Sequence, residues 1–154
     1  MEIIGIRAAP TKIFYSIISV EGDTFSTTQQ ELIIPLSFDI PQKLKYIRKT
    51  LLDIFNEYNI VKAGIRVTEH NATPHEFRLK LEGIIQELIA SSKVDAYFTG
   101  VKSSIGSRLG ISNNGDITEV MEGRISFKDI PDWATLSTEY RECIMVAFAT
   151  LNQN

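Results

Sequence analysis

The chain has 154 residues, of which 44% are hydrophobic and 23% are charged, a length that suits one globular domain spanning residues 1–154. Its formal net charge of −3 at pH 7 excludes a uniformly basic protein that grips nucleic acid over its whole surface, although a local basic patch is compatible with it. The only cysteine, Cys143, excludes an intramolecular disulfide and favours a reducing, cytoplasmic compartment. No apolar run reaches the ~18 residues of a membrane-spanning helix, and no signal-peptide pattern opens the chain, so we expect no membrane partner.

The N-terminal third has the patterning of β-strands. Residues 2–7 and 12–20 are short apolar runs rich in β-branched and aromatic residues, and residues 24–34 carry threonines that suit an exposed sheet face. Turn-forming residues separate the three runs. The pattern predicts a three-stranded antiparallel meander.

The spacing of apolar residues changes to three and four after residue 40, which predicts an amphipathic helix that begins at Pro41 and ends near Asn59. Two short apolar strands, 61–67 and 94–98, enclose a second helix at about 74–91. This order is a βαβ unit, which places its two strands in parallel.

The last third is less regular. Residues 102–109 predict a short helix, the polar segment 112–116 predicts a turn or mobile loop, and residues 126–132 predict a loop. A final helix is predicted over about 137–151, where apolar residues again recur at helical spacing.

This order of elements resembles the ribonuclease H-like superfamily, and more closely its RuvC-type Holliday-junction resolvases. Three stretches carry the resemblance: IIGIRAAP at 3–10 is similar to the family's first hairpin, AGIRVTE at 63–69 to its fourth strand, and EYRECIMVA at 139–147 to its last helix. The resemblance covers almost the whole chain. It implies an α/β fold with a five-stranded mixed sheet, made of the meander plus the βαβ unit and flanked by helices.

The resemblance also implies a nuclease site. Such enzymes cut phosphodiesters with two divalent cations, Mg²⁺ or Mn²⁺, held by carboxylates from separate elements. By resemblance, the catalytic metal ligands are Glu69 after the fourth strand, with Glu139 and Glu142 three residues apart on the last helix.

The fourth family position departs from the pattern. The family has an aspartate at the end of the first strand, where this chain has Arg7, and a permanently positive guanidinium repels metal ions. We expect Arg7 to take the place of the metals and to pair with Glu69 and with Glu142. The predicted function is therefore a catalytically impaired nuclease relative that binds nucleic acid or a protein partner; the alternative is an active metal-dependent endonuclease with an altered site.

Simpler interpretations of the same residues stay open. Arg7 could point into solvent and Glu69 could be an ordinary loop acid, while Glu139 and Glu142 suit a helix N-terminus because acids complement the helix dipole. His70 and His75 bracket a turn beside Glu69, but their spacing matches no strong ligand motif, which favours surface or capping histidines.

Two further groups bear on partners. Trp133 and Phe127 could serve a homodimer interface, as resolvase-type relatives are dimers, or an ordinary core. Cys143 is expected to be a buried structural thiol. Basic residues on the first helix and after the fifth strand could track phosphates, or form solvated helix faces: Lys43, Lys45, Arg48, Lys49, Lys102 and Arg108.

Overall fold

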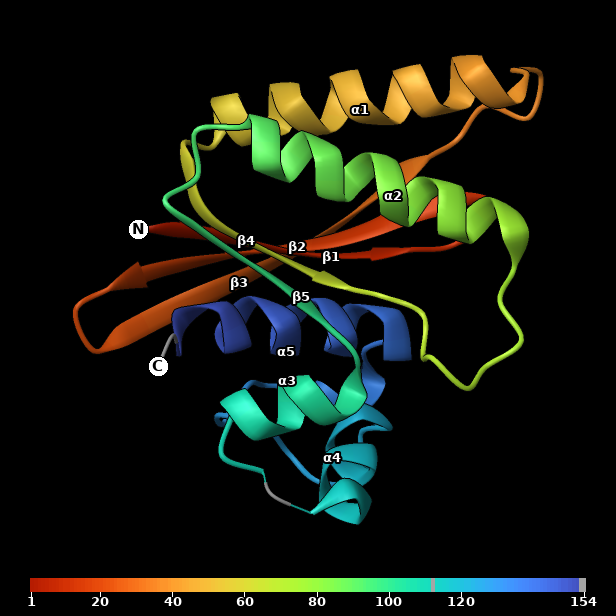
Figure 1. Ribbon diagram of the computed structural model, residues 1–154. Helices are drawn as coiled ribbons and strands as arrows, with labels where there is room; N and C mark the ends of the chain where they lie inside the picture. Colours follow the sequence, from red (N-terminus) through yellow and green to blue (C-terminus); the bar gives the residue numbers. More distant parts are fainter. Residues whose placement is uncertain (112, 153–154) are drawn as a thin grey trace.

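Five strands form one mixed sheet in the computed structural model of the chain, which describes residues 1–111 and 113–152 (Figure 1). The strand order is β3-β2-β1-β4-β5. The antiparallel meander consists of β1 (Glu2–Ala8), β2 (Lys12–Glu21) and β3 (Thr24–Ile33), and the parallel pairs join β1 to β4 (Ile60–Arg66) and β4 to β5 (Ala96–Gly100). The predicted meander and βαβ unit are both confirmed.

One face of the sheet is covered by α1 (Ile40–Glu57) and α2 (Glu76–Ser91), as Figure 1 shows. The start of α1 is set by a capping box, in which Asp39 accepts from the backbone of Gln42 and the Gln42 side chain accepts from the backbone of Asp39. Apolar residues of the two helices and of alternate strand positions form the core of this layer.

The other face is covered by α5 (Thr138–Leu151), which is itself covered by α3 (Lys102–Arg108) and α4 (Asn114–Met121) (Figure 1). Gly5 and Gly64 are paired in the sheet directly beneath α5. A Cβ at Gly5 would collide with the carbonyl oxygen of Cys143, and one at Gly64 would crowd the Val146 carbonyl. The two glycines therefore let α5 lie unusually close to the sheet, and its residues 141–150 are buried on every side.

Two boundaries differ from the sequence prediction. The segment 112–116, predicted as a turn or mobile loop, contains the start of α4: the Asn113 side chain caps this helix by accepting from Gly115 N at 2.8 Å, while Ser112 lies outside the described residues. Asn, Gly and Asp favour both turns and helix starts, so composition alone cannot separate the two. The fifth strand lies two residues later than predicted, because Val94 precedes the parallel pairing that begins at Ala96.

In the described part of the chain, no helix combines the length and apolar character needed to cross a lipid bilayer.

Candidate functional site

The carboxyl ends of β1 and β4 carry the same tripeptide, Gly-Ile-Arg, at 5–7 and 64–66. Parallel pairing places Arg7 directly beside Arg66. Side chains alternate between the two faces of a strand, so the isoleucines enter the core under α1 and α2 and both arginines turn toward α5. A repeated motif thus delivers two guanidinium groups to one point at the edge of the sheet.

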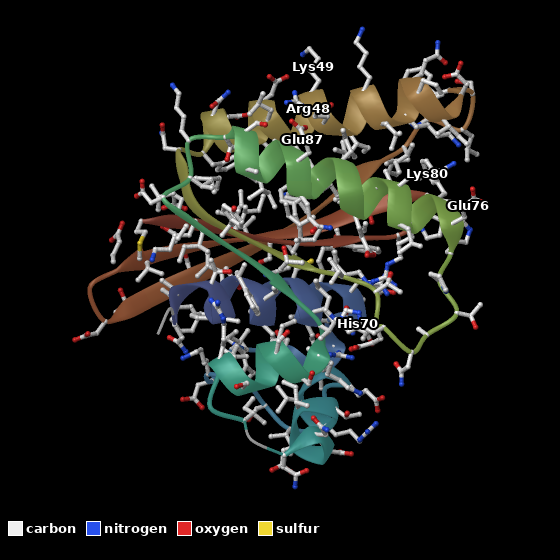
Figure 2. All side chains as sticks on the ribbon, viewed as in Figure 1. Arg48, Lys49, His70, Glu76, Lys80 and Glu87 are labelled. Atoms are coloured by element: carbon white, nitrogen blue, oxygen red, sulfur yellow. The ribbon has the colours of Figure 1, made fainter. Side chains whose placement is uncertain are left out.

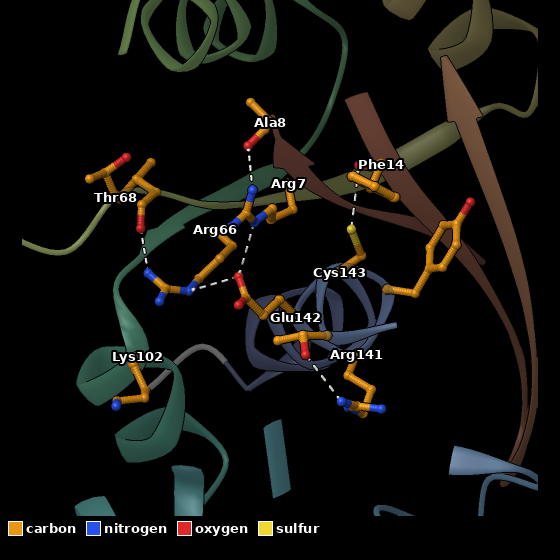
Figure 3. A network of polar contacts seen from close by, with 12 residues as sticks. Arg7, Ala8, Phe14, Arg66, Thr68, Lys102, Arg141, Glu142 and Cys143 are labelled. Carbon is orange, nitrogen blue, oxygen red and sulfur yellow. Dashed lines mark hydrogen bonds and ion pairs between the residues drawn. The ribbon is translucent and has the colours of Figure 1, made fainter. Parts of the chain in front are cut away.

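The two guanidinium groups meet the carboxylate of Glu142, from the second turn of α5 (Figure 3). Its Oε2 atom lies 3.4 Å from Nε of Arg7 and 3.2 Å from Nε of Arg66. The side chains of Arg66 and Glu142 are each 9% exposed, and that of Arg7 is 18% exposed. Since solvent is largely excluded, each charge depends on its protein partners for neutralisation.

Glu69 joins this group from the loop after β4. Its Oε1 atom accepts a hydrogen bond from Nη2 of Arg66 at 2.8 Å and another from the backbone N–H of Lys102, at the start of α3, at 2.9 Å. Arg66 therefore bridges two carboxylates, and Glu69 connects the β4–α2 loop to α3.

A third acid lies on the α2 side. The buried carboxylate of Glu82 accepts from Thr68 N at 2.9 Å and Thr68 Oγ1 at 2.7 Å, and it lies 2.9 Å from Nε of Arg78. Burial and the neighbouring charge of Arg7 lower the pKa of Arg78, although Glu82 opposes this effect. We call the six side chains the arginine–glutamate cluster: Arg7, Arg66, Arg78, Glu69, Glu82 and Glu142.

The donor set of this cluster does not suit a pair of divalent cations. The Oε2 atom of Glu142 already faces two guanidinium groups, and Oε1 of Glu69 already accepts two hydrogen bonds. Among residues 1–111 and 113–152, no three His, Cys, Asp or Glu side chains are grouped as metal ligands. The positive charge beside the Glu142 carboxylate comes from Arg7 and Arg66.

The predicted site residues are brought together only in part. Arg7 pairs with Glu142 as expected, but it does not pair with Glu69, because Arg66 lies nearer to that carboxylate and binds it. Glu139 lies half-buried in the first turn of α5 and makes no ion pair within the described part of the chain. Arg66 was missed by the sequence analysis, although the repeated Gly-Ile-Arg tripeptide was the signal that could have found it.

The six predicted basic residues do not form one patch. Lys43, Lys45, Arg48 and Lys49 lie on α1, in the layer above the sheet, whereas Lys102 and Arg108 lie on α3, in the layer below (Figure 1). Figure 2 shows Arg48 close to Glu87 of α2, and its Nε lies 2.7 Å from Glu87 Oε2. The guanidinium of Arg108 stacks over the Phe98 ring, 3.9 Å from its centroid.

The histidine and aromatic candidates lie outside the arginine–glutamate cluster. His70 and His75 are exposed, and His75 precedes α2 without a side-chain capping bond. Trp133 and Phe127 are buried against each other with ring centroids 5.3 Å apart, so the interface interpretation is wrong for this pair and the core interpretation is confirmed.

Cys143 is buried, as expected, and its Sγ donates to the Phe14 carbonyl at 3.3 Å (Figure 3). Burial, with the nearby charge of Glu142, raises the pKa of its thiol well above the usual value. Because the thiol is buried, it is a structural group of the core.

An open cleft of about 420 Å³ lies beside the cluster, between the β4–α2 loop and helices α3 and α4. Glu69 and Asn71 line one side, and Lys102 and Ser103 line the other. The cleft makes this edge of the sheet accessible to a ligand.

Solved structures resemble this fold over nearly the whole chain. The Thermus thermophilus RuvC structure matches 99% of this chain and 94% of its own, with 10% identity and a TM-score of 0.70. The chain has a ribonuclease H-like fold of the RuvC type. The T. thermophilus RuvC in complex with Holliday junction substrate has the same identity and coverage and a TM-score of 0.66.

A viral protein has the same architecture. The Fowlpox virus resolvase in its complex with substrate Holliday junction DNA matches 97% of this chain and 93% of its own, with 12% identity and a TM-score of 0.51. No protein-family model and no curated protein matches the sequence. At such identities the likeness concerns the fold, and the function has to be argued from the site.

Proposed function

We propose that this chain is a RuvC-like protein of nucleic-acid metabolism that binds branched or structured nucleic acid and has lost two-metal cleavage. The observation that carries the proposal is the pairing of Arg7 and Arg66 with the single carboxylate of Glu142. Two-metal hydrolysis needs free carboxylate oxygens for the cations, and one oxygen of Glu142 and one of Glu69 already face guanidinium groups. The carboxylates keep the scaffold of a nuclease site without its metals.

Charge balance explains how nucleic-acid binding is retained when two-metal cleavage is lost. Carboxylates without metals would repel a phosphate backbone, but the three arginines of the arginine–glutamate cluster balance its three glutamates. Phosphates can then approach the neighbouring cleft without a divalent cation, and Lys102 on its rim offers a positive charge. T. thermophilus RuvC and the Fowlpox virus resolvase, which share this fold, were both solved with a Holliday junction substrate, which makes a four-way junction the first ligand to test.

The test combines binding and cleavage on one set of samples. Purified protein is mixed with labelled four-way junction, linear duplex and structured RNA in Mg²⁺, in Mn²⁺ and in EDTA, beside Arg7→Asp and Glu69→Gln variants. We expect salt-dependent retardation that persists in EDTA, with no cleavage by the wild type. The retention of binding in EDTA separates an arginine-neutralised site from a metal-dependent one.

Two results would overturn the proposal. Cleavage by the wild type that disappears in Glu69→Gln would establish the alternative, an active endonuclease using Mg²⁺ or Mn²⁺ at an altered site. The absence of retardation of every nucleic acid at low salt would favour a protein partner. Sedimentation of the free protein and of the junction complex tests the expected homodimer, since a two-fold symmetric junction suits a symmetric dimer.

A further inference from the structure

The outer side of α1 carries a groove that the arginine–glutamate cluster does not use. Gln42, Lys45, Tyr46 and Lys49 share one side of the helix because they recur at intervals of three and four. Together with Phe38, from the turn before α1, they line an open groove of about 270 Å³. Its floor is aromatic and its rim carries two lysines.

The aromatic floor is ordered without a ligand. Phe38 and Tyr46 pack edge to face, with ring centroids 5.8 Å apart and an interplanar angle of 81°. The backbone N–H of Phe38 donates to the Pro35 carbonyl at 3.3 Å, and the capping box at Asp39 holds the next turn. A ligand that stacks here would meet a surface already in place, so little entropy is lost in ordering the site.

Basic residues are concentrated in the first half of α1. After the N-cap Asp39, the first turn has no acidic residue, and Lys43, Lys45, Arg48 and Lys49 follow in close succession. Lys43 and Arg48 face α2: Lys43 lies over the Phe77 ring, 5.3 Å from its centroid, and Arg48 pairs with an acid of that helix.

The remaining two lysines face the groove. Lys49 pairs with Asp53 on the same helix at 2.9 Å, with side chains 73% and 63% exposed, and such a surface pair is weak. Figure 2 shows Lys49 on the outer side of α1, away from the sheet. An anion could therefore displace Asp53 at small cost, and Lys45 offers a second positive charge four residues earlier.

We propose that this groove binds a single-stranded nucleic-acid segment; the inference rests on the proposed nucleic-acid-binding function. One base packs against the aromatic pair of Tyr46 and Phe38, and phosphates lie at Lys45 and Lys49. A partly exposed aromatic ring beside cations matches the platforms that hold single strands. The volume lies just below the range of about 300–1,000 Å³ for small-molecule pockets, so it admits one base and not a helix. A duplex, whose bases are already stacked, can use only the lysines.

The test compares single and double strands of equal length. Anisotropy of a labelled oligo(dT) and of a matched duplex is titrated with wild-type protein, Tyr46→Ala, Tyr46→Phe and the double variant Lys45→Gln/Lys49→Gln. We expect Tyr46→Ala to weaken oligo(dT) binding about 5- to 100-fold, with Tyr46→Phe near the wild type. The lysine variant should lower the slope of log K against log salt by about 1.4, for two lost phosphate contacts on a single strand.

Matched controls exclude general effects. Tyr97→Ala removes an aromatic side chain that is 57% exposed on β5, and Lys93→Gln removes an exposed lysine after α2, so both should bind oligo(dT) like the wild type. Thermal unfolding of each variant confirms that it is folded. Equal losses in Tyr97→Ala and Tyr46→Ala would overturn the proposal.

Failure of this inference is distinguishable from failure of the proposed function. If the four-way junction is bound but oligo(dT) binding is unchanged by Tyr46→Ala, the groove is not a single-strand site and the proposed function stands. If neither ligand binds, both fail. Displacement of oligo(dT) by an acidic peptide, with equal loss of both in Tyr46→Ala, would reassign the groove to a protein partner and overturn the inference.

Discussion

Arg7 and Arg66 are register neighbours on two parallel strands, and their Nε atoms lie 3.4 and 3.2 Å from the same oxygen of Glu142. Two guanidinium groups that face the same carboxylate would repel each other if that carboxylate were absent. The stability of the sheet edge therefore depends on Glu142 and, for Arg66, on the additional bond to Glu69.

Removal of Arg66 should destabilise the protein more than removal of Arg7. Arg66 is the more buried of the two and binds both Glu69 and Glu142, so Arg66→Met leaves two carboxylates without that partner, at a cost of about 3–5 kcal/mol. Arg7→Met leaves Glu142 paired with Arg66 and should cost less. Urea unfolding measures both free energies.

A double variant provides the check on this interpretation. Arg66→Met/Glu142→Gln should be less destabilised than the sum of the two single variants, because the neutral amide no longer needs a cation. Additive losses would show that the two residues do not depend on each other.

Gly5→Ala should severely destabilise the fold. A methyl group at this position collides with the Cys143 carbonyl, and backbone of a buried helix cannot yield locally. We expect loss of several kcal/mol in urea unfolding, or no folded protein. Gly83→Ala is the matched control: its Cβ would meet open space on α2, and we expect a gain of up to about 1 kcal/mol from helix propensity.

Arg141 should hold together the segment before α5. Its buried guanidinium donates to the carbonyls of Met121, at 2.6 Å, and of Leu136. Arg141→Met leaves these buried carbonyls without their donor, at about 1–3 kcal/mol each. Trp133, the only tryptophan, lies in the same segment, so we expect a red shift of its emission together with lower stability.

An exposed arginine in the same region serves as the control. Arg124 pairs with Glu119 at the surface, and Arg124→Met should change the free energy of unfolding by no more than about 1 kcal/mol. If Arg124→Met and Arg141→Met were equally destabilising, the buried carbonyl contacts would not be the cause.

The Arg48–Glu87 pair between α1 and α2 should make the free energy of unfolding depend on pH. Hydrogen bonds from Arg48, and then from Ser91, lower the pKa of Glu87 below the ordinary 4.5, so its contribution is present above the unfolded-state pKa and is lost as pH falls through the folded-state pKa. The stability advantage of the wild type over Glu87→Gln at pH 7 should shrink as the pH falls below about 5. Unfolding curves at pH 7, 5 and 3 provide the measurement, and a constant difference at the three values would contradict the assignment.

The local patterns of the sequence predicted most elements of the fold. Alternating or continuous apolar runs correspond to the strands, and apolar spacings of three and four correspond to α1, α2 and α5. The segment from 112 to 116 is predicted as a turn or mobile loop because its residues favour turns, but the same residues also favour helix starts. The helix α4 is stabilised there because Ile117, Val120 and Met121 are buried in the core cluster that includes residues of α5.

The sequence by itself determined the order of elements and the presence of Arg7 where the family resemblance implies an aspartate. Only the tertiary structure decided that Arg66 stands between Glu69 and Glu142, and that the basic residues of α1 and α3 lie on opposite sides of the sheet. Hydrophobic periodicity is a local property that one segment carries alone. The pairing of charges depends on strand register and helix placement, which join residues as far apart in the chain as Arg7 and Glu142.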